Sequence, residues 1–196
     1  MVAIPSFQLS LGQLAWTLNH GRPADARMRN ELRYLRRVGI PHDEDDVSEG
    51  RGNRILYGFE ELIECGVAQY AIRRGIKIAD VAQILIRERK KFKRLYRETV
   101  EKLPDSAFVA DWVKSRGKII TFIQNECFLR IHDRYSSKSS TYQLILPGTA
   151  IPGGEVFGLH EIIEGDEARV LVPLVKLTTE LVAWAKDAPQ IRPGRP

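Results

Sequence analysis

The chain has 196 residues, of which 43% are hydrophobic and 28% charged, and its formal net charge is +5. This composition suits one ordinary soluble domain or two small ones and excludes a low-complexity chain. Two cysteines exclude a disulfide framework, and no apolar run approaches the roughly 18 residues of a membrane span. The first residues, MVAIPSFQLSLGQLAW, lack the basic start of a signal peptide. We therefore expect a cytoplasmic protein with no membrane partner.

The positive charge is concentrated in the first half of the chain. Residues 1–103 hold 19 Lys and Arg against 14 Asp and Glu, whereas residues 104–196 hold 11 of each. Pro104 follows a long helical pattern and marks a boundary between the two halves. A basic unit of this kind admits a polyanionic partner such as nucleic acid.

Four helices are predicted in the basic half, from apolar residues at helical spacing and from capping signals. The first starts at Ser10 in SLGQLAWTL, and the second runs from Asp25 to Gly39. The third spans residues 58–75, and the fourth runs from about residue 77 to residue 103.

The polar segment between the second and third helices predicts a short hairpin. Its tip carries Gly50 and Gly52, and Ile55, Leu56 and Tyr57 are expected in the returning strand.

The second predicted helix separates its apolar residues from its arginines. At about 100° per residue, Leu32 and Leu35 fall within roughly 40° of Met28, and all three are expected to face inward. Four arginines cover the sector from about 80° to about 180°, and Arg27 lies on the other flank. Such a charge run is often only a solvated surface, but arginine in particular suits phosphates and guanine edges. The four are Arg29, Arg33, Arg36 and Arg37.

Several segments, taken in order and spacing, resemble the winged-helix domain of MerR-type transcriptional regulators. These are LRYLRRVGI, then GRGNRILYGFEEL, then IRRGIKIADVAQIL and a long charged helix, together covering about residues 8–103. The resemblance implies a winged helix-turn-helix DNA-binding domain over residues 1–77 and a linking and dimerisation helix over residues 78–103. It also implies a twofold homodimer that reads two half-sites on double-stranded DNA. The predicted DNA-binding residues are Arg27, Arg29, Arg33, Tyr34, Arg36, Arg37, Arg51 and Arg54.

The fourth helix supports a dimer on its own pattern. Leu85, Phe92, Tyr96 and Leu103 are spaced by 7, 4 and 7 residues, which is typical of a coiled-coil seam. The alternative is an amphipathic helix that packs on the C-terminal part of its own chain.

The second half predicts a small strand-rich module over residues 104–187. Short β-prone runs are KIITFI, ECFLRIHD, TYQLILPG, EVFGLHEI and ARVLVPLV, followed by a helix in LVKLTTELVAWAK and a disordered tail over residues 188–196. The predicted fold class is α+β. In MerR-type regulators such a module often holds a small-molecule effector or a protein partner.

The sequence carries no catalytic signature. A nucleophile beside a base, a phosphate loop and a carboxylate pair are all missing, and the four histidines are scattered. We expect no enzyme activity, no cofactor and no metal site. The predicted function is a homodimeric, sequence-specific, double-stranded DNA-binding regulator of bacterial type, associated with the nucleoid. The alternatives are an architectural or recombination accessory protein that bends DNA, and an adaptor whose basic helices bind an acidic protein.

Overall fold

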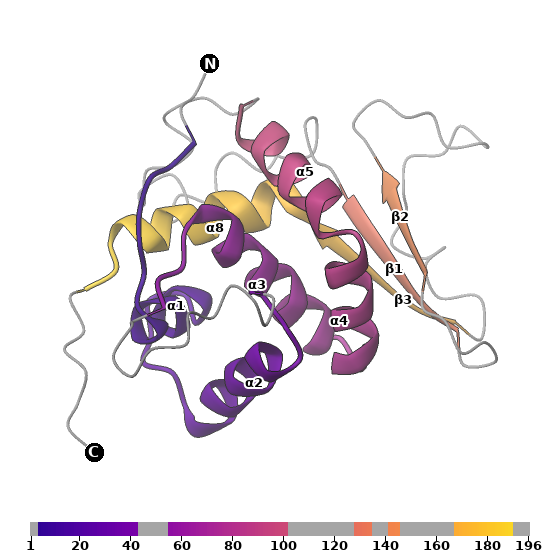
Figure 1. Ribbon diagram of the computed structural model, residues 1–196, viewed down its shortest axis with the longest axis horizontal. Helices are drawn as coiled ribbons and strands as arrows, with labels where there is room; N and C mark the ends of the chain where they lie inside the picture. Colours follow the sequence, from indigo (N-terminus) through magenta and orange to yellow (C-terminus); the bar gives the residue numbers. More distant parts are fainter. Residues whose placement is uncertain (1–3, 43–54, 102–127, 135–140, 146–166, 190–196) are drawn as a thin grey trace, which may run out of the picture.

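The computed structural model describes residues 4–42, 55–101, 128–134, 141–145 and 167–189. Within these ranges the chain forms six α-helices and three β-strands and is mostly helical (Figure 1). The α+β class and the winged-helix arrangement stay predictions, because much of the second half and most of the expected wing lie outside these ranges.

The first two helices begin where capping residues predict. Helix α1 (Leu11–Leu18) follows Ser10, whose hydroxyl accepts a hydrogen bond from the Gln13 amide while the Gln13 side chain accepts one from the Ser10 amide. Helix α2 (Ala26–Arg37) follows Asp25, whose carboxylate accepts a hydrogen bond from the backbone at 2.7 Å. Each cap satisfies a backbone donor that the first helical turn leaves open. Both predicted helix starts are confirmed.

The predicted helix over residues 77–103 is wrong in one respect, because it is two helices. Helix α4 (Ile78–Arg87) is followed by Glu88 as its C-cap, and helix α5 (Arg89–Glu101) starts at the next residue. Both contact the long helix α3 (Phe59–Ile72). The change of direction at Glu88 lets each of the two helices bury its own apolar stripe against that common neighbour (Figure 1).

The apolar residues of α4 and α5 require a correction to the predicted dimer. Leu85, Phe92 and Tyr96 are only 1%, 2% and 0% exposed in the single chain, and the rings of Phe92 and Tyr96 stack 6.4 Å apart. They pack against neighbouring helices of the same chain, so they are not available as an intersubunit seam. The alternative, an amphipathic helix packed within its own chain, describes these residues. Leu103 lies outside the described residues.

Three strands form an antiparallel sheet in the order β2-β1-β3. They are β1 (Phe128–Arg134), β2 (Thr141–Ile145) and β3 (Glu167–Pro173), with Ile131 opposite both Tyr142 and Val170. The strands predicted in ECFLRIHD, TYQLILPG and ARVLVPLV are therefore confirmed. Those predicted in KIITFI and EVFGLHEI lie outside the described residues.

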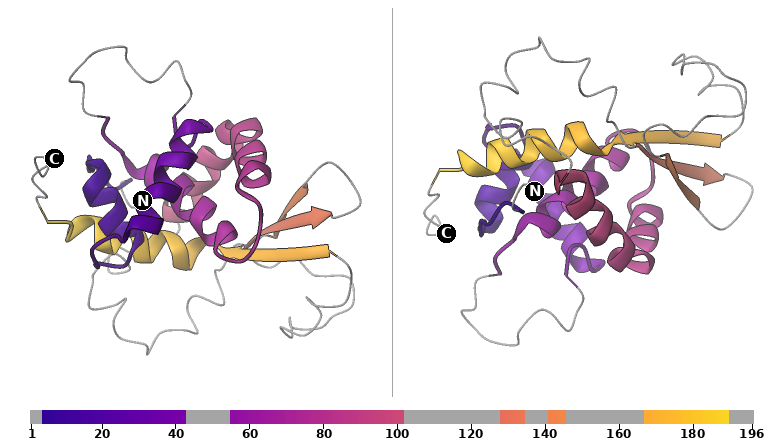
Figure 2. Two further views of the ribbon diagram at one scale, coloured as in Figure 1. Left: turned by 90° about the horizontal axis from the view of Figure 1, so that it is seen from below. Right: turned by 90° about the horizontal axis from the view of Figure 1, so that it is seen from above.

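Helix α8 (Leu174–Lys186) follows β3 without an intervening residue and packs against α1, α3 and α5 (Figure 2). The indole of Trp184 meets that of Trp16 edge to face, with ring centroids 5.7 Å apart. Gly66 of α3 lies so close to Leu181 that an added Cβ would be 2.3 Å from its Cδ1. One hydrophobic core therefore includes residues from both sides of Pro104.

This packing changes how the chain divides. The sequence predicts a separate module over residues 104–187, yet α8 lies in the same core as the helices of residues 1–103. No periodicity in the second half distinguishes a helix that packs on its own sheet from one that packs on distant helices. Ala188 also packs against this core, whereas residues 190–196 of the predicted tail lie outside the described ranges.

Tyr57, which is expected in the returning strand of the hairpin, pairs with the N-terminal segment. Tyr57 forms an isolated antiparallel bridge with Leu9, and each backbone amide donates to the other residue's carbonyl at 2.9 Å. The N-terminal segment thus lies beside the start of α3, and the rest of the predicted hairpin falls outside the described residues. Among the described residues, no helix is long and apolar enough to cross a membrane.

Candidate nucleic-acid interface

Helix α2 is held at both ends. At its start, the Asp25 carboxylate accepts a hydrogen bond from the Met28 amide. The negative charge of Asp25 also interacts favourably with the positive end of the helix dipole. At its end, Gly39 adopts a left-handed φ of 87°, which a side chain would disfavour, and the Ile40 amide returns to the Leu35 carbonyl at 2.9 Å. The direction of α2 relative to the core is therefore well defined.

The two faces of α2 differ as the sequence predicts. Met28, Leu32 and Leu35 are 4%, 4% and 0% exposed and anchor the helix to the core. The four arginines of the opposite face are all exposed, and Tyr34 beside them is 43% exposed. We call this exposed set the arginine face of α2; it consists of Arg29, Arg33, Arg36 and Arg37.

Within the described residues, few polar groups form hydrogen bonds or ion pairs with the arginines of α2. Arg27, on the flank, pairs with Glu31 at 3.0 Å, and Arg33 donates a long 3.4 Å hydrogen bond to the Asn30 side chain. No ion pair joins the arginine face to a carboxylate in the part of the chain that the structure describes. Exposed guanidinium groups in this state can take up phosphate oxygens or base edges without first breaking a strong internal contact.

The predicted wing contacts, Arg51 and Arg54, lie outside the described residues. The four acids of DEDD at residues 43–46, between α2 and the expected wing, lie there too. The structure therefore brings together the six predicted residues on α2 and leaves the two in the wing as predictions.

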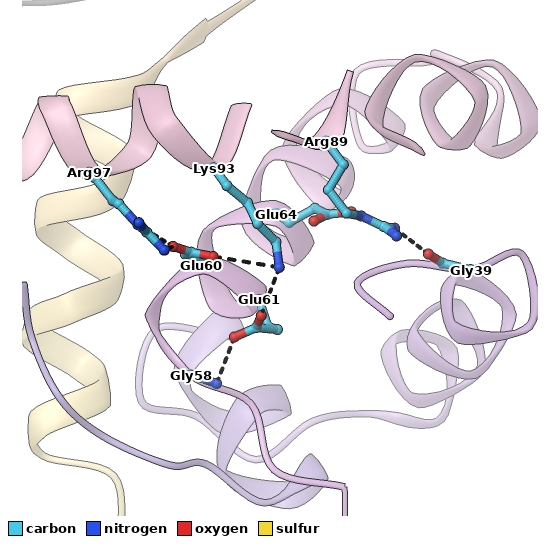
Figure 3. Close-up of polar contacts among 8 residues, drawn as sticks. All are labelled: Gly39, Gly58, Glu60, Glu61, Glu64, Arg89, Lys93 and Arg97. Carbon is cyan, nitrogen blue, oxygen red and sulfur yellow. Dashed lines mark hydrogen bonds and ion pairs between the residues drawn. The ribbon is translucent and has the colours of Figure 1, made fainter. Parts of the chain in front are cut away.

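Arg89 ties the end of α2 to the rest of the core. Its guanidinium donates to the Glu64 carboxylate of α3, with both Nε and Nη2 at 3.0 Å, and Nη2 also donates to the Gly39 carbonyl (Figure 3). The side chains of Arg89 and Glu64 are 10% and 2% exposed. Because a guanidinium presents several donors in one plane, a single residue can connect three segments. Arg89 thus positions α2 without being part of its exposed surface.

The ionisation of Glu64 reflects its depth in the core. Burial raises the pKa of its carboxyl group from an ordinary 4.5 to about 7, although the hydrogen bonds and charge of Arg89 act in the opposite direction. The neighbouring thiol of Cys65 is also buried, and desolvation raises its pKa well above the usual value. A raised thiol pKa means little reactive thiolate, so nothing here favours cysteine chemistry.

Two further cations of α5 also face acids of α3. Lys93 lies 3.5 Å from Glu60 and 3.2 Å from Glu61, and Arg97 pairs with Glu60 (Figure 3). The Glu61 carboxylate also accepts a hydrogen bond from the Gly58 amide and so caps the start of α3. Burial, the largest single influence, raises the pKa of Glu61, but a hydrogen bond from its own backbone amide together with the charge and hydrogen bond of Lys93 outweighs it, so the pKa is lowered.

These ion pairs between α5 and α3 were not predicted from the sequence, although the spacing of the charged residues indicates them. Basic residues recur every four positions at 89, 93 and 97, and acids occur at 60, 61 and 64, so each set lies on one side of its helix. The consequence is that these three cations of α5 are engaged with α3. The basic character of residues 1–103 is therefore not all available to a polyanion, and the arginine face of α2 accounts for more of it than the sequence indicates.

Comparison of the chain with models of known protein families, with curated proteins and with solved structures found no match. In the described residues there is no cluster of three or more His, Cys, Asp or Glu side chains that could hold a metal ion.

Proposed function

We propose that this chain binds double-stranded DNA through the arginine face of α2. The observation that carries the proposal is the combination of three buried apolar anchors and four exposed arginines on opposite sides of one 12-residue helix. A helix of this length is about 18 Å long. The major groove of B-DNA is about 12 Å wide and admits an α-helix, so α2 can lie in the groove with its arginine face toward the DNA.

The chemistry of the face favours nucleic acid over an acidic protein. Arginine forks match phosphate oxygens and the O6 and N7 acceptors of guanine, and each bidentate contact to a guanine edge is worth about 1–3 kcal/mol of discrimination. Tyr34 is an exposed residue, and its hydroxyl group can donate a hydrogen bond to a phosphate. Arg51 and Arg54 are proposed to contact the flanking backbone.

The finer proposal is a sequence-specific transcriptional regulator of the MerR type that acts as a homodimer at the bacterial nucleoid. It is supported by the resemblance of the segments around residues 32–40 and 50–62. Because Leu85, Phe92 and Tyr96 are buried inside the chain, a dimer has to use another surface. Sedimentation of the free protein and of its complex with DNA would establish the number of chains bound to each site.

The first prediction concerns Arg33→Ala. Loss of one phosphate contact should weaken binding to a selected site and to random duplex by a similar factor. It should also reduce the slope of log K against log salt by about one. Fluorescence anisotropy of labelled duplexes at several salt concentrations measures both quantities. The matched control is Lys90→Ala, which removes an exposed cation of α5 that is not part of the arginine face.

Three results separate the alternatives. Unchanged binding in Arg33→Ala, Arg29→Ala and Arg36→Ala would contradict the proposed face. Equal losses in Lys90→Ala would indicate a general charge effect. An absence of steep salt dependence with any duplex, together with binding to an acidic protein, would favour the adaptor.

A further inference from the structure

A pocket of about 550 Å³ lies between α1 and α2, beside Pro189, which comes after α8. Helix α1 lines one side with positions 11, 12, 15 and 16, and α2 lines the other with positions 29, 32 and 33. The loop between the two helices contributes Pro23 and Ala24. Because Arg29 and Arg33 are among the lining residues, the pocket borders the arginine face of α2.

Most of the residues that line this pocket are apolar. Ala15 and Leu32 are only 5% and 4% exposed and form its inner wall. Leu11 is 37% exposed, so a large apolar side chain of the pocket also faces solvent. The indole of Trp16 is oriented by its edge-to-face contact with Trp184. Apolar walls of this kind favour a ligand whose own apolar surface displaces water from them.

The charges of the pocket have one sign. Among the described residues that line it, only Arg29 and Arg33 are ionisable, so its formal charge is +2. Both are exposed, and in the described chain neither pairs with a carboxylate; Arg33 donates only the long 3.4 Å hydrogen bond to Asn30. The two arginines are four positions apart on α2 and are therefore neighbours on its surface, so both guanidinium groups can contact one anionic group.

The walls and the charges together define a class of ligand. Pockets for small organic ligands occupy about 300–1,000 Å³, and this pocket lies within that range. We propose that it binds an organic anion with an apolar body, whose carboxylate or phosphate group is held by Arg29 and Arg33. Because these two residues also belong to the arginine face, the bound anion competes with DNA phosphates for them. This competition rests on the proposed function, whereas binding of the anion itself does not.

The first test measures binding to the full-length protein without DNA. 2-Naphthoate and naphthyl phosphate carry the two candidate anionic groups on the same apolar body, naphthamide carries this body without a charge, and acetate and inorganic phosphate lack the body. Titration calorimetry at matched ionic strength gives each dissociation constant. At least one naphthyl anion should bind about tenfold or more tightly than naphthamide and than the small anion with the same charged group. The tighter of the two naphthyl anions assigns the charged group.

Two arginine variants test the charged end of the site. Arg29→Gln and Arg33→Gln should each weaken binding of the preferred naphthyl anion by about tenfold, because each removes a charge-assisted hydrogen bond. Binding of naphthamide should not change in either variant, because this compound has no charge. Lys90→Gln removes an exposed cation that does not line the pocket and should leave all affinities unchanged.

Gly12→Leu tests the apolar part of the site without removing either arginine. Gly12 is an exposed residue of α1 that lines the pocket, and leucine favours a helix more than glycine does, so this variant should fold. Its side chain should fill the space and abolish binding of the naphthyl anion. Gln83→Leu, at an exposed position of α4 outside the pocket, is the control and should bind the anion as the unchanged protein does.

The second test adds a labelled DNA duplex at constant ionic strength. At about ten times its dissociation constant, the preferred naphthyl anion should weaken DNA binding about tenfold, because it occupies the shared arginines. In Gly12→Leu, the affinity for DNA should no longer respond to the anion.

The results distinguish failure of this inference from failure of the proposed function. The site is overturned if neither naphthyl anion binds more tightly than naphthamide, or if Gly12→Leu binds the preferred anion as tightly as the unchanged protein. An affinity for DNA that stays constant in saturating anion overturns the shared use of Arg29 and Arg33. If the protein binds no duplex at all, the proposed function is contradicted, and anion binding that is lost in Gly12→Leu still supports the site.

Discussion

At the scale of single residues, Glu64 carries a pH dependence that can be worked out from its pKa. Burial raises that pKa from 4.5 to about 7 in the folded chain. Between these values the folded chain holds a proton that the unfolded chain has released. The contribution of Glu64 to stability therefore falls as the pH rises from about 4.5 to about 7 and is level above that range.

The prediction concerns Glu64→Gln, which imitates the protonated carboxyl group and does not titrate. The free energy of unfolding of the unchanged protein, minus that of the variant, should fall by about 3 kcal/mol between pH 4.5 and pH 7.5. Urea unfolding across this range measures the difference. Glu98→Gln, which replaces a side chain that is 42% exposed, serves as the control. A difference that stays constant with pH would show that Glu64 is ionised throughout.

A second prediction compares two arginines of α5. Arg89→Met leaves the Glu64 carboxylate buried without its partner and the Gly39 carbonyl without this donor, so it should destabilise the protein by about 3–5 kcal/mol at pH 8. Arg94→Met removes an exposed pair with Glu98, which should cost less than about 1 kcal/mol. Chemical denaturation measures both changes. Similar losses in the two variants would mean that the buried pair has no special role.

At the scale of helices and strands, a third prediction tests the packing of α1 on α8. Gly21 and Gly75 both have left-handed φ angles, 77° and 97°. An added Cβ would meet Trp184 at 2.4 Å in the first case and nothing within 4 Å in the second. Gly75→Ala should therefore cost about 1–2 kcal/mol from backbone strain alone, and Gly21→Ala about 1–3 kcal/mol more.

The measurement is the free energy of unfolding of each variant, with Trp184→Leu as a background. In that background the excess cost of Gly21→Ala should shrink, because the ring that it meets is gone. An excess that persists without the indole would assign the cost to the backbone.

Local patterns explain which elements were predictable. Ser10 and Asp25 mark helix starts within a few residues of themselves, and the sides of α2 follow from a period of 3.6. The break at Glu88 has no such signal, because its cause lies in α3, 25 residues before Arg89. The spacing of Leu85, Phe92 and Tyr96 identified a buried stripe correctly but did not specify which surface covers it.

For the candidate site too, local sequence patterns predict only what lies within one element. The arginine face of α2 was found because its residues lie on one helix, and periodicity alone groups them. The contacts of Arg89 with Glu64 and Gly39 join residues from distant segments, so sequence spacing could not bring them together. The partner of Tyr57 was missed for this reason too: Leu9 precedes it by two helices.

At the scale of the whole molecule, α8 is part of the main core. Nine of its 13 residues are buried, including three leucines and two valines. Burying one such side chain contributes about 1.5–3 kcal/mol, so these five contribute on the order of 10 kcal/mol. A typical domain is stable by only about 5–15 kcal/mol. The helices of residues 1–103 therefore depend on α8 for a share of stability that is comparable to the total.

The last prediction follows from this dependence and differs from the expectation from the sequence, which placed the DNA-binding domain and the dimerisation helix together in residues 1–103, before a separate module. A chain ending at Leu103 would expose the apolar surfaces of α1, α3 and α5 that α8 covers. It should show no cooperative thermal unfolding and no salt-dependent binding to duplex DNA. The control is a chain ending at Pro189, which keeps α8 and should behave like the full-length protein in both measurements. If the chain ending at Leu103 instead unfolded cooperatively and bound DNA with the full salt slope, α8 would be an attachment to an independent domain. The boundary at Pro104 would then be the functional one.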